Sequence, residues 1–99
     1  MVTELALLSI RPGEQASFEA AFARVSVLLA AADGHDKHRL VPSLDQADLY
    51  VLEVQWRDLA AHVDMFEPSD AHARFMAALE PFFAAEPRVI HVPARSADD

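Results

Sequence analysis

Residues 48–56 show the most regular alternation of hydrophobic and polar positions in the chain. One row is aliphatic and aromatic and the other is half polar: Tyr50, Leu52, Val54 and Trp56 alternate with Leu49, Val51, Glu53 and Gln55. Successive side chains of a β-strand point to opposite faces, so a period of two indicates a strand. The segment is therefore predicted to be a strand with one buried face.

A short helix is predicted directly after this strand. Asp58 can accept a hydrogen bond from the free backbone N–H groups of a first helical turn. Beyond it, positions recur at helical spacing: Leu59, His62, Val63 and Phe66. Pro68 ends this helix, and Ser69 followed by Asp70 marks the start of another. His62 is therefore expected among apolar neighbours near the end of the strand.

The N-terminal part of the chain predicts a strand, a helix and a second strand. Residues 3–10, TELALLSI, are apolar on both alternating rows, which is typical of a strand covered on both faces. Residues 14–32 form a predicted helix with one hydrophobic stripe: Phe18, Phe22, Val25 and Leu29. Residues 35–44 are a more polar strand. Pro42 lacks the N–H that an interior strand donates, so this strand is placed at the edge of the sheet or at a bulge.

The C-terminal part predicts one more helix and one more strand. The helix begins at Asp70 and carries an inner stripe: Ala71, Phe75, Ala78, Leu79 and Phe82. Pro81 should kink or end it, because proline removes a helical hydrogen bond. Residues 88–92 form the last strand, between Pro87 and Pro93.

The predicted order is strand, helix, strand, strand, helix, strand. This order is typical of the ferredoxin-like α+β fold, βαββαβ with an antiparallel sheet. Its two helices cover only one face of the sheet, whereas the strands that begin at Thr3 and Asp48 are apolar on both rows. A second copy of the chain is expected to cover the open face, which predicts a homodimer.

Length and charge limit the possible classes of protein. Ninety-nine residues suffice for one domain, placed at residues 1–93, and residues 94–99 are expected to be a frayed acidic tail. A net charge of −8 disfavours binding to nucleic acid or anionic lipid, and no apolar run approaches a membrane span. The chain has no cysteine and begins without a secretory pattern, so a cytoplasmic location is expected.

Five segments spread over residues 2–93 carry a further pattern. They are VTELALLSIRPG, FEAAF, EVQW, AAHVDMFEPSDAHARF and PFFAAEPRVIHV. With these segments the chain resembles the antibiotic biosynthesis monooxygenase family of dimeric α+β barrel proteins. The resemblance implies a homodimer joined through the open faces of two sheets. It also implies an enzyme that oxidises a small aromatic, polyketide- or quinol-like compound with O2 and uses neither metal nor flavin.

Other functions stay open because a fold does not fix a function. One alternative is a non-catalytic small-molecule-binding or stress-related module on the same scaffold. Another is an isomerase or cyclase that uses the same base without oxygen.

Two positions depart from similar chains. Haem-degrading relatives use a tryptophan and a histidine where this chain has Met65 and Phe75, so haem ligation is not expected. Similar chains often have Phe-Arg where this chain has Phe66 and Glu67, which removes a cationic contact to an acidic or phenolate substrate.

Metal and nucleotide cofactors are not expected either. His35 and His38 are three apart on a predicted strand, which sends them to opposite faces, and His62 and His72 lie on separate helices. With only two glycines the chain has no glycine-rich phosphate loop.

A cofactor-free oxygenase needs a base and a dry aromatic pocket. His62 is the candidate base, with Trp56 beside it at the end of the strand row. The predicted substrate-binding residues are Tyr50, Phe66, His72, Met76 and Phe83. Simpler roles are a backbone hydrogen bond for His62, core packing for Trp56 and a surface position for His72.

Two carboxylates lie on otherwise apolar strands, Glu4 and Glu53. An unpaired buried charge is costly, so they are expected near strand ends or paired with arginine or histidine across the dimer. For Glu53 we favour pairing, with His91 as a possible partner.

Overall fold

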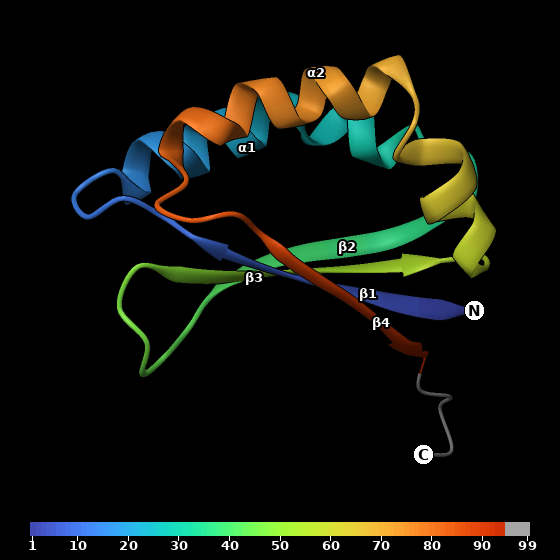
Figure 1. Cartoon of the computed structure of the whole chain (residues 1–99), viewed down its shortest axis with the longest axis horizontal. Helices are drawn as coiled ribbons and strands as arrows, with labels where there is room; N and C mark the ends of the chain where they lie inside the picture. Colours follow the sequence, from blue (N-terminus) through green and yellow to red (C-terminus); the bar gives the residue numbers. More distant parts are fainter. Residues whose placement is uncertain (95–99) are drawn as a thin grey trace.

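In the computed structural model, which describes residues 1–94, a four-stranded antiparallel sheet carries two helices on one face (Figure 1). The strands lie in the order β2-β3-β1-β4. Their bounds are β1 Val2–Ser9, β2 His35–Pro42, β3 Leu49–Trp56 and β4 Arg88–Pro93, and the helices are α1 Gln15–Ala30 and α2 Asp70–Leu79. The predicted ferredoxin-like α+β fold is confirmed. The predicted acidic tail, residues 94–99, lies outside the described residues from residue 95 on.

The two central strands bury one row of side chains under the helices. β1 pairs with β3 along its whole length, and its other edge pairs with β4. The inner row of β3 is buried at each position and the outer row is only partly covered, as its alternation predicts. The core under α1 and α2 consists mainly of Ala6, Leu8, Ile10, Phe18, Phe22, Leu29, Leu52, Val54, Trp56, Phe75 and Leu79.

The predicted edge strand is confirmed as β2, but one detail of it is wrong. The pairing with β3 shifts register between His35 and Lys37, which marks a β-bulge. An extra residue changes which side chains share a face, because a strand alternates strictly only without bulges. His35 Nε2 and His38 Nδ1 are consequently 2.8 Å apart instead of on opposite faces.

The helix after β3 is a π-helix, η1, spanning Ala61–Phe66. The predicted cap is confirmed, since the Asp58 carboxylate accepts a 2.8 Å hydrogen bond from the Ala61 N–H. The predicted stripe is only half right: His62 and Phe66 are buried, whereas Leu59 and Val63 are 48% and 38% exposed. A π-turn holds more residues than an α-turn, so α-helical spacing does not keep these four on one face.

The start and end of α2 follow the predicted signals. The Ser69 hydroxyl accepts a hydrogen bond from the His72 N–H at 3.1 Å. Phe75 and Leu79 are buried, and the chain turns into the 3₁₀ helix η2 (Glu80–Phe82), which contains Pro81. Among residues 1–94 no helix is long and apolar enough to cross a membrane.

Candidate functional site

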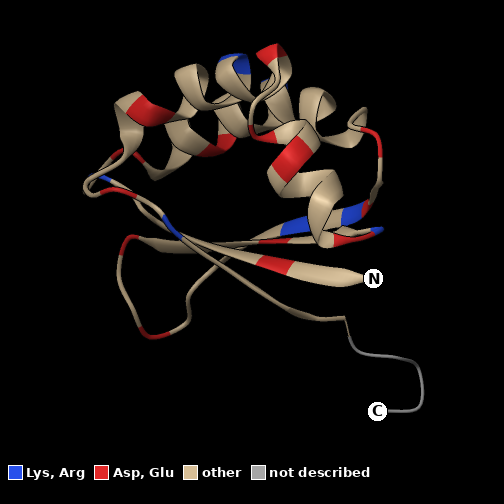
Figure 2. Cartoon of the chain, turned by 45° about the vertical axis from the view of Figure 1, so that its right-hand side comes forward, with Lys and Arg blue, Asp and Glu red and all other residues tan. Residues whose placement is uncertain are grey.

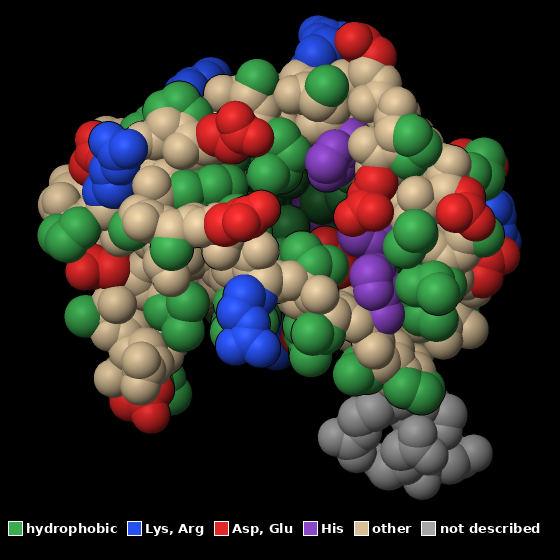
Figure 3. All heavy atoms as spheres, in the orientation of Figure 1, with side chains coloured by type: hydrophobic (Ala, Val, Ile, Leu, Met, Phe, Trp, Pro, Cys, Tyr) green, Lys and Arg blue, Asp and Glu red, His purple; other side chains and the backbone are tan. Residues whose placement is uncertain are grey.

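A cavity of about 230 Å³ lies between the sheet and α2. Its sheet side is formed by β1 and β3, its roof by α2, and its ends by the segments around η1 and before β4. It is lined by Glu4, Ala6, Leu8, Leu29, Leu52, His62, Phe66, Glu67, His72, Phe75, Met76, Leu79, Phe83, Glu86, Pro87 and Val89. Figure 3 shows this face of the molecule, where histidines and carboxylates gather around a hollow with a hydrophobic interior.

Most of the predicted site residues meet at this cavity. Five of them line it: His62, Phe66, His72, Met76 and Phe83. Trp56 does not line it but is completely buried behind His62, with the two rings stacked at 5.0 Å. Four of the five residues expected as substrate-binding thus lie around the same cavity as His62, and their functional role stays a prediction.

Tyr50 is the exception, because it lies outside the cavity. Its ring packs against Phe18 of α1 at 5.0 Å, and its hydroxyl donates a hydrogen bond to Glu19. Burial is the largest of the effects that raise the pKa of Tyr50, to about 12, and the contact with Glu19 adds to it. Tyr50 shares the inner row of β3 with Trp56, but six residues along a strand separate them by about 20 Å.

Trp56 and His62 converge on the carboxyl group of Glu4. The Trp56 indole N–H donates to Glu4 Oε1 at 2.9 Å, and His62 Nε2 lies 3.3 Å from the same oxygen. Glu4 and His62 are only 6% and 3% exposed. The stacked tryptophan fixes the plane of the imidazole ring, and its N–H fixes the carboxyl group.

The second nitrogen of His62 is also engaged. His62 Nδ1 lies 2.8 Å from Nε2 of His91, which is half-buried on β4. On the other side of the ring, Glu67 Oε2 is 3.7 Å from Nε2. Since each neutral imidazole has one donor and one acceptor nitrogen, the His62–His91 hydrogen bond can run in either direction.

Burial dominates the electrostatics of this pair. It raises the pKa of Glu4 to about 7, although the Trp56 hydrogen bond opposes the shift. Burial also lowers the pKa of His62 to about 4, helped by the nearby His91 and His72. Both shifts disfavour the charged forms, so the 3.3 Å contact between Glu4 Oε1 and His62 Nε2 joins two groups that burial favours in their neutral forms. Glu4 exchanges its proton in the pH range where a general base is most useful.

Glu4 and His91 are the site residues that the sequence reasoning did not assign. The pairing expected for Glu53 is present, but with Arg39 of the same chain, at 3.3 Å on the open face of the sheet, so His91 as its possible partner is wrong. His91 instead lies opposite Glu4 in the β1–β4 ladder. Glu4 shares the inner row of β1 with Ala6 and Leu8, so the alternation itself held the signal for its burial.

No group of three or more histidine and carboxylate side chains within residues 1–94 is arranged to hold a metal ion. The two positions compared with haem-degrading relatives differ in surroundings: Met65 is 49% exposed and Phe75 is buried.

Comparisons with known proteins agree with this architecture. A family model described as antibiotic biosynthesis monooxygenase matches residues 1–78. YczJ of Bacillus subtilis, an uncharacterised protein, is 31% identical over 91 residues, which cover 92% of this chain and 96% of YczJ.

Two solved structures show the same fold. One is a protein of Bordetella bronchiseptica assigned to the same monooxygenases, with 27% identity, a TM-score of 0.90, and coverage of 96% of this chain and 97% of that one. The other is a variant of SnoaB, a cofactor-independent oxygenase from Streptomyces nogalater, with 23% identity, a TM-score of 0.78, and coverage of 97% and 94%. From its sequence, its fold and the family model, the chain belongs to the antibiotic biosynthesis monooxygenase family.

Proposed function

We propose that the protein is a cofactor-independent monooxygenase that oxidises a small aromatic, polyketide- or quinol-like compound with O2. The observation that carries the proposal is the buried Glu4–His62 contact on the wall of an otherwise apolar cavity. A substrate that loses a proton there becomes a carbanion or phenolate able to donate an electron to O2. In the oxidation of an anthrone-like CH2 group, one oxygen atom becomes the new carbonyl, and the other leaves as water with the two hydrogens.

The proton acceptor is the Glu4–His62 pair rather than His62 alone. Both ring nitrogens of His62 already face partners, Nε2 toward Glu4 and Nδ1 toward His91. Glu4 Oε1 receives the Trp56 N–H, and Oε2 makes no hydrogen bond to another side chain or backbone group of residues 1–94. A substrate hydroxyl or acidic C–H in the cavity can therefore reach Glu4 Oε2, with His62 and Trp56 holding the carboxyl group in place.

The cavity favours an uncharged aromatic substrate. Its walls are provided by Phe66, His72, Met76 and Phe83, in line with the prediction from the sequence. Among the described residues no lysine or arginine lines it, whereas Glu67 and Glu86 do. A carboxylated substrate would meet like charges without a cationic partner, so a hydroxylated ring without a carboxylate fits best.

Oxygen uptake with a hydroxylated anthrone or a naphthol tests this function. We expect uptake that depends on the protein and yields an oxygenated product without added metal or flavin. Tyr50→Phe, outside the cavity, serves as a matched control and should retain this activity. Product formation without oxygen would indicate the isomerase or cyclase instead, and binding without any product would indicate a small-molecule-binding module.

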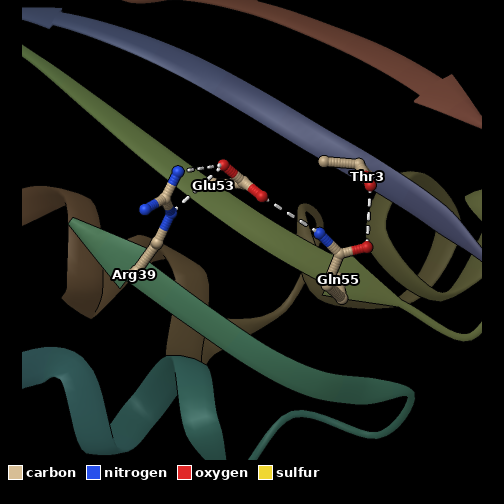
Figure 4. Close-up of polar contacts among 4 residues, drawn as sticks. All are labelled: Thr3, Arg39, Glu53 and Gln55. Atoms are coloured by element: carbon tan, nitrogen blue, oxygen red, sulfur yellow. Dashed lines mark hydrogen bonds and ion pairs between the residues drawn. The ribbon is translucent and has the colours of Figure 1, made fainter. Parts of the chain in front are cut away.

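The face of the sheet that carries no helix, the open face, supports the proposed homodimer. On it, Ile90 and Val92 of β4 are 46% and 38% exposed, next to the outer residues Leu5 and Leu7 of β1. Figure 4 shows a line of polar contacts across this face, in which Arg39 contacts Glu53, Glu53 contacts Gln55, and Gln55 contacts Thr3. A surface of this kind, apolar with its polar groups already paired, suits contact with a second copy of the chain.

A further inference from the structure

Three titratable side chains from three separate elements form a continuous row. Glu4 comes from β1, His62 from η1 and His91 from β4. The atoms that join them are 3.3 Å apart between Glu4 Oε1 and His62 Nε2, and 2.8 Å apart between His62 Nδ1 and His91 Nε2. The first two side chains are buried, whereas His91 is half-buried. The row therefore leads from the cavity wall to the surface.

We propose that Glu4, His62 and His91 form a proton relay, in which His91 exchanges protons between the buried pair and solvent. The proposal rests on the proposed function, because a bound substrate supplies the proton. His91 itself acts through His62 and does not line the cavity.

The hydrogen-bonding capacity of the two rings allows this transfer without movement of the backbone. When Glu4 is protonated, it donates to His62 Nε2, and His62 donates from Nδ1 to His91 Nε2. One proton can then pass from Glu4 to His62 Nε2 while another passes from His62 Nδ1 to His91 Nε2. The result is a carboxylate at Glu4, a neutral His62 and a protonated His91, so one proton has moved outward along the row.

The overall reaction explains how the relay is reset. Oxidation of a CH2 group by O2 to a carbonyl and water releases no net proton. The proton removed at the start of the reaction is needed again when water forms. Its return from His91 through His62 restores the original tautomers of both rings. The stacked Trp56 keeps the His62 ring in the plane that both transfers require.

Two other titratable groups face His62 and must be separated from the relay. Glu67 Oε2 lies 3.7 Å from Nε2, at the end of η1, and His72 faces the ring from α2. The 3.7 Å distance from Glu67 to the ring is too long for a hydrogen bond, and the Glu67 side chain is 41% exposed. Glu67 therefore adds charge near the ring but is not part of the relay. His91 lies on the inner row of β4, so the proposed dimer through the outer face leaves it accessible.

The first test is the substitution His91→Ala, assayed for oxygen uptake with and without added imidazole. We expect turnover to fall on the order of tenfold, less than for loss of a general base itself, and to recover when imidazole fills the vacated position. His38→Gln is the matched control, because His38 also lies 2.8 Å from another histidine but on β2, outside the cavity. Full turnover in His91→Ala, or a loss that imidazole does not restore, would overturn the relay.

The second test needs no substrate and so separates the relay from the proposed function. Nitrogen-15 spectra of the free protein report which ring nitrogen of each histidine carries the proton. We expect His62 to change from the Nδ1–H to the Nε2–H tautomer as Glu4 loses its proton, and Glu4→Gln to abolish this change while Glu67→Gln preserves it. A single His62 tautomer at all pH values, or a change that depends on Glu67, contradicts the relay even if the protein consumes oxygen.

Discussion

At the scale of single residues, burial decides the protonation states of Glu4 and His62. Burial raises the pKa of Glu4 to about 7, so near neutral pH it is divided between its protonated and ionised forms, and burial keeps His62 neutral, although the two groups touch. An exposed pair of the same residues would be expected to form a salt bridge instead. The buried contact with Trp56 is what distinguishes this pair from a surface ion pair, because it removes water from both rings and donates to the carboxyl group.

These pKa shifts predict an unusual dependence of stability on pH. The raised pKa of Glu4 makes the folded state lose stability as the pH rises from about 4.5 to 7. The lowered pKa of His62 makes it gain stability as the pH rises from about 4 to 6.5. Each shift changes the free energy of unfolding by roughly 3 kcal/mol over its pH range, and the two changes have opposite signs, so they nearly cancel in the parent protein.

Glu4→Gln should therefore expose the contribution of His62. Burial, His91 and His72 cause the His62 shift, and all three remain in this variant. We expect its free energy of unfolding, measured with urea, to rise by roughly 3 kcal/mol between pH 4 and 6.5, while that of the parent stays nearly flat. His62→Gln should show the opposite slope. If the variants and the parent give parallel profiles, the two shifts are not linked to folding in this way.

His62→Gln also tests the chemistry. Glutamine keeps a polar side chain of similar reach but cannot titrate. We expect oxygen uptake per folded molecule to fall by about a hundredfold to ten-thousandfold. A histidine with a purely structural role would instead cost roughly 1 to 3 kcal/mol of stability and leave turnover unchanged. Oxygen uptake and thermal unfolding, measured on the same sample, distinguish the two outcomes.

The sequence identified part of this site because alternation places side chains on faces. His62 followed from helical spacing among apolar positions, and Trp56 from the buried row of β3. Glu4 was recognised as an unusual carboxylate, but its partner was not, because residues 52 positions apart are joined only by strand pairing. The role of His91 depends on the register between β1 and β4, which local patterns do not contain.

At the scale of elements, the position of His62 depends on the π-turn of η1 and on the close approach of η1 to Gly34, in the segment between α1 and β2. The π-turn was not predicted, and a bulge in β2 was predicted only as an alternative to an edge position, on the ground of Pro42 rather than at His35–Lys37, where it lies. Both features insert one residue into an otherwise regular repeat, so regular spacing does not locate them. The consequence is specific in each case: the first turns Leu59 and Val63 outward, and the second joins His35 to His38. Regular segments such as β3 and the start of α2 were predicted well because every local signal agreed.

Gly34 is the point where the chain before β2 meets η1. Its φ is +90°, and a Cβ added there would lie 2.5 Å from the Cβ of Ala61, the residue before His62. We expect Gly34→Ala to lose about 1–2 kcal/mol from backbone strain and about 1–3 kcal/mol from overpacking. It should also lower oxygen uptake, because η1 must shift to make room.

Gly13→Ala provides the matched control for this prediction. Gly13 also has a positive φ, +84°, but a Cβ there would have no neighbour within 4 Å. It should lose only the strain part, about 1–2 kcal/mol, and keep its activity. Urea unfolding of both variants measures the difference, and equal losses would contradict a close contact between Gly34 and η1.

At the scale of the whole molecule, acidic residues outnumber basic ones, and the net charge is −8. Figure 2 shows acidic positions on the helices, the loops and the strands, while basic positions are few. On the open face, by contrast, Arg39 pairs with Glu53 across neighbouring strands. The excess of negative charge therefore does not oppose contact between two such faces, because this charged pair is already neutralised within each chain.

The proposed homodimer gives the last prediction. Because the open face carries Leu5, Leu7, Ile90 and Val92 next to a satisfied polar line, we expect the dimer to bury at least on the order of 1,200 Å² in total and to persist at micromolar concentration. Ile90→Asp should weaken it strongly, since it would bury an unpaired charge within the contact. Val27→Asp is the control, because Val27 is 62% exposed on α1, away from this face. Sedimentation equilibrium should show a dimer for the parent and for Val27→Asp, and a monomer for Ile90→Asp. A monomeric parent at micromolar concentration would mean that the open face does not join two copies of the chain.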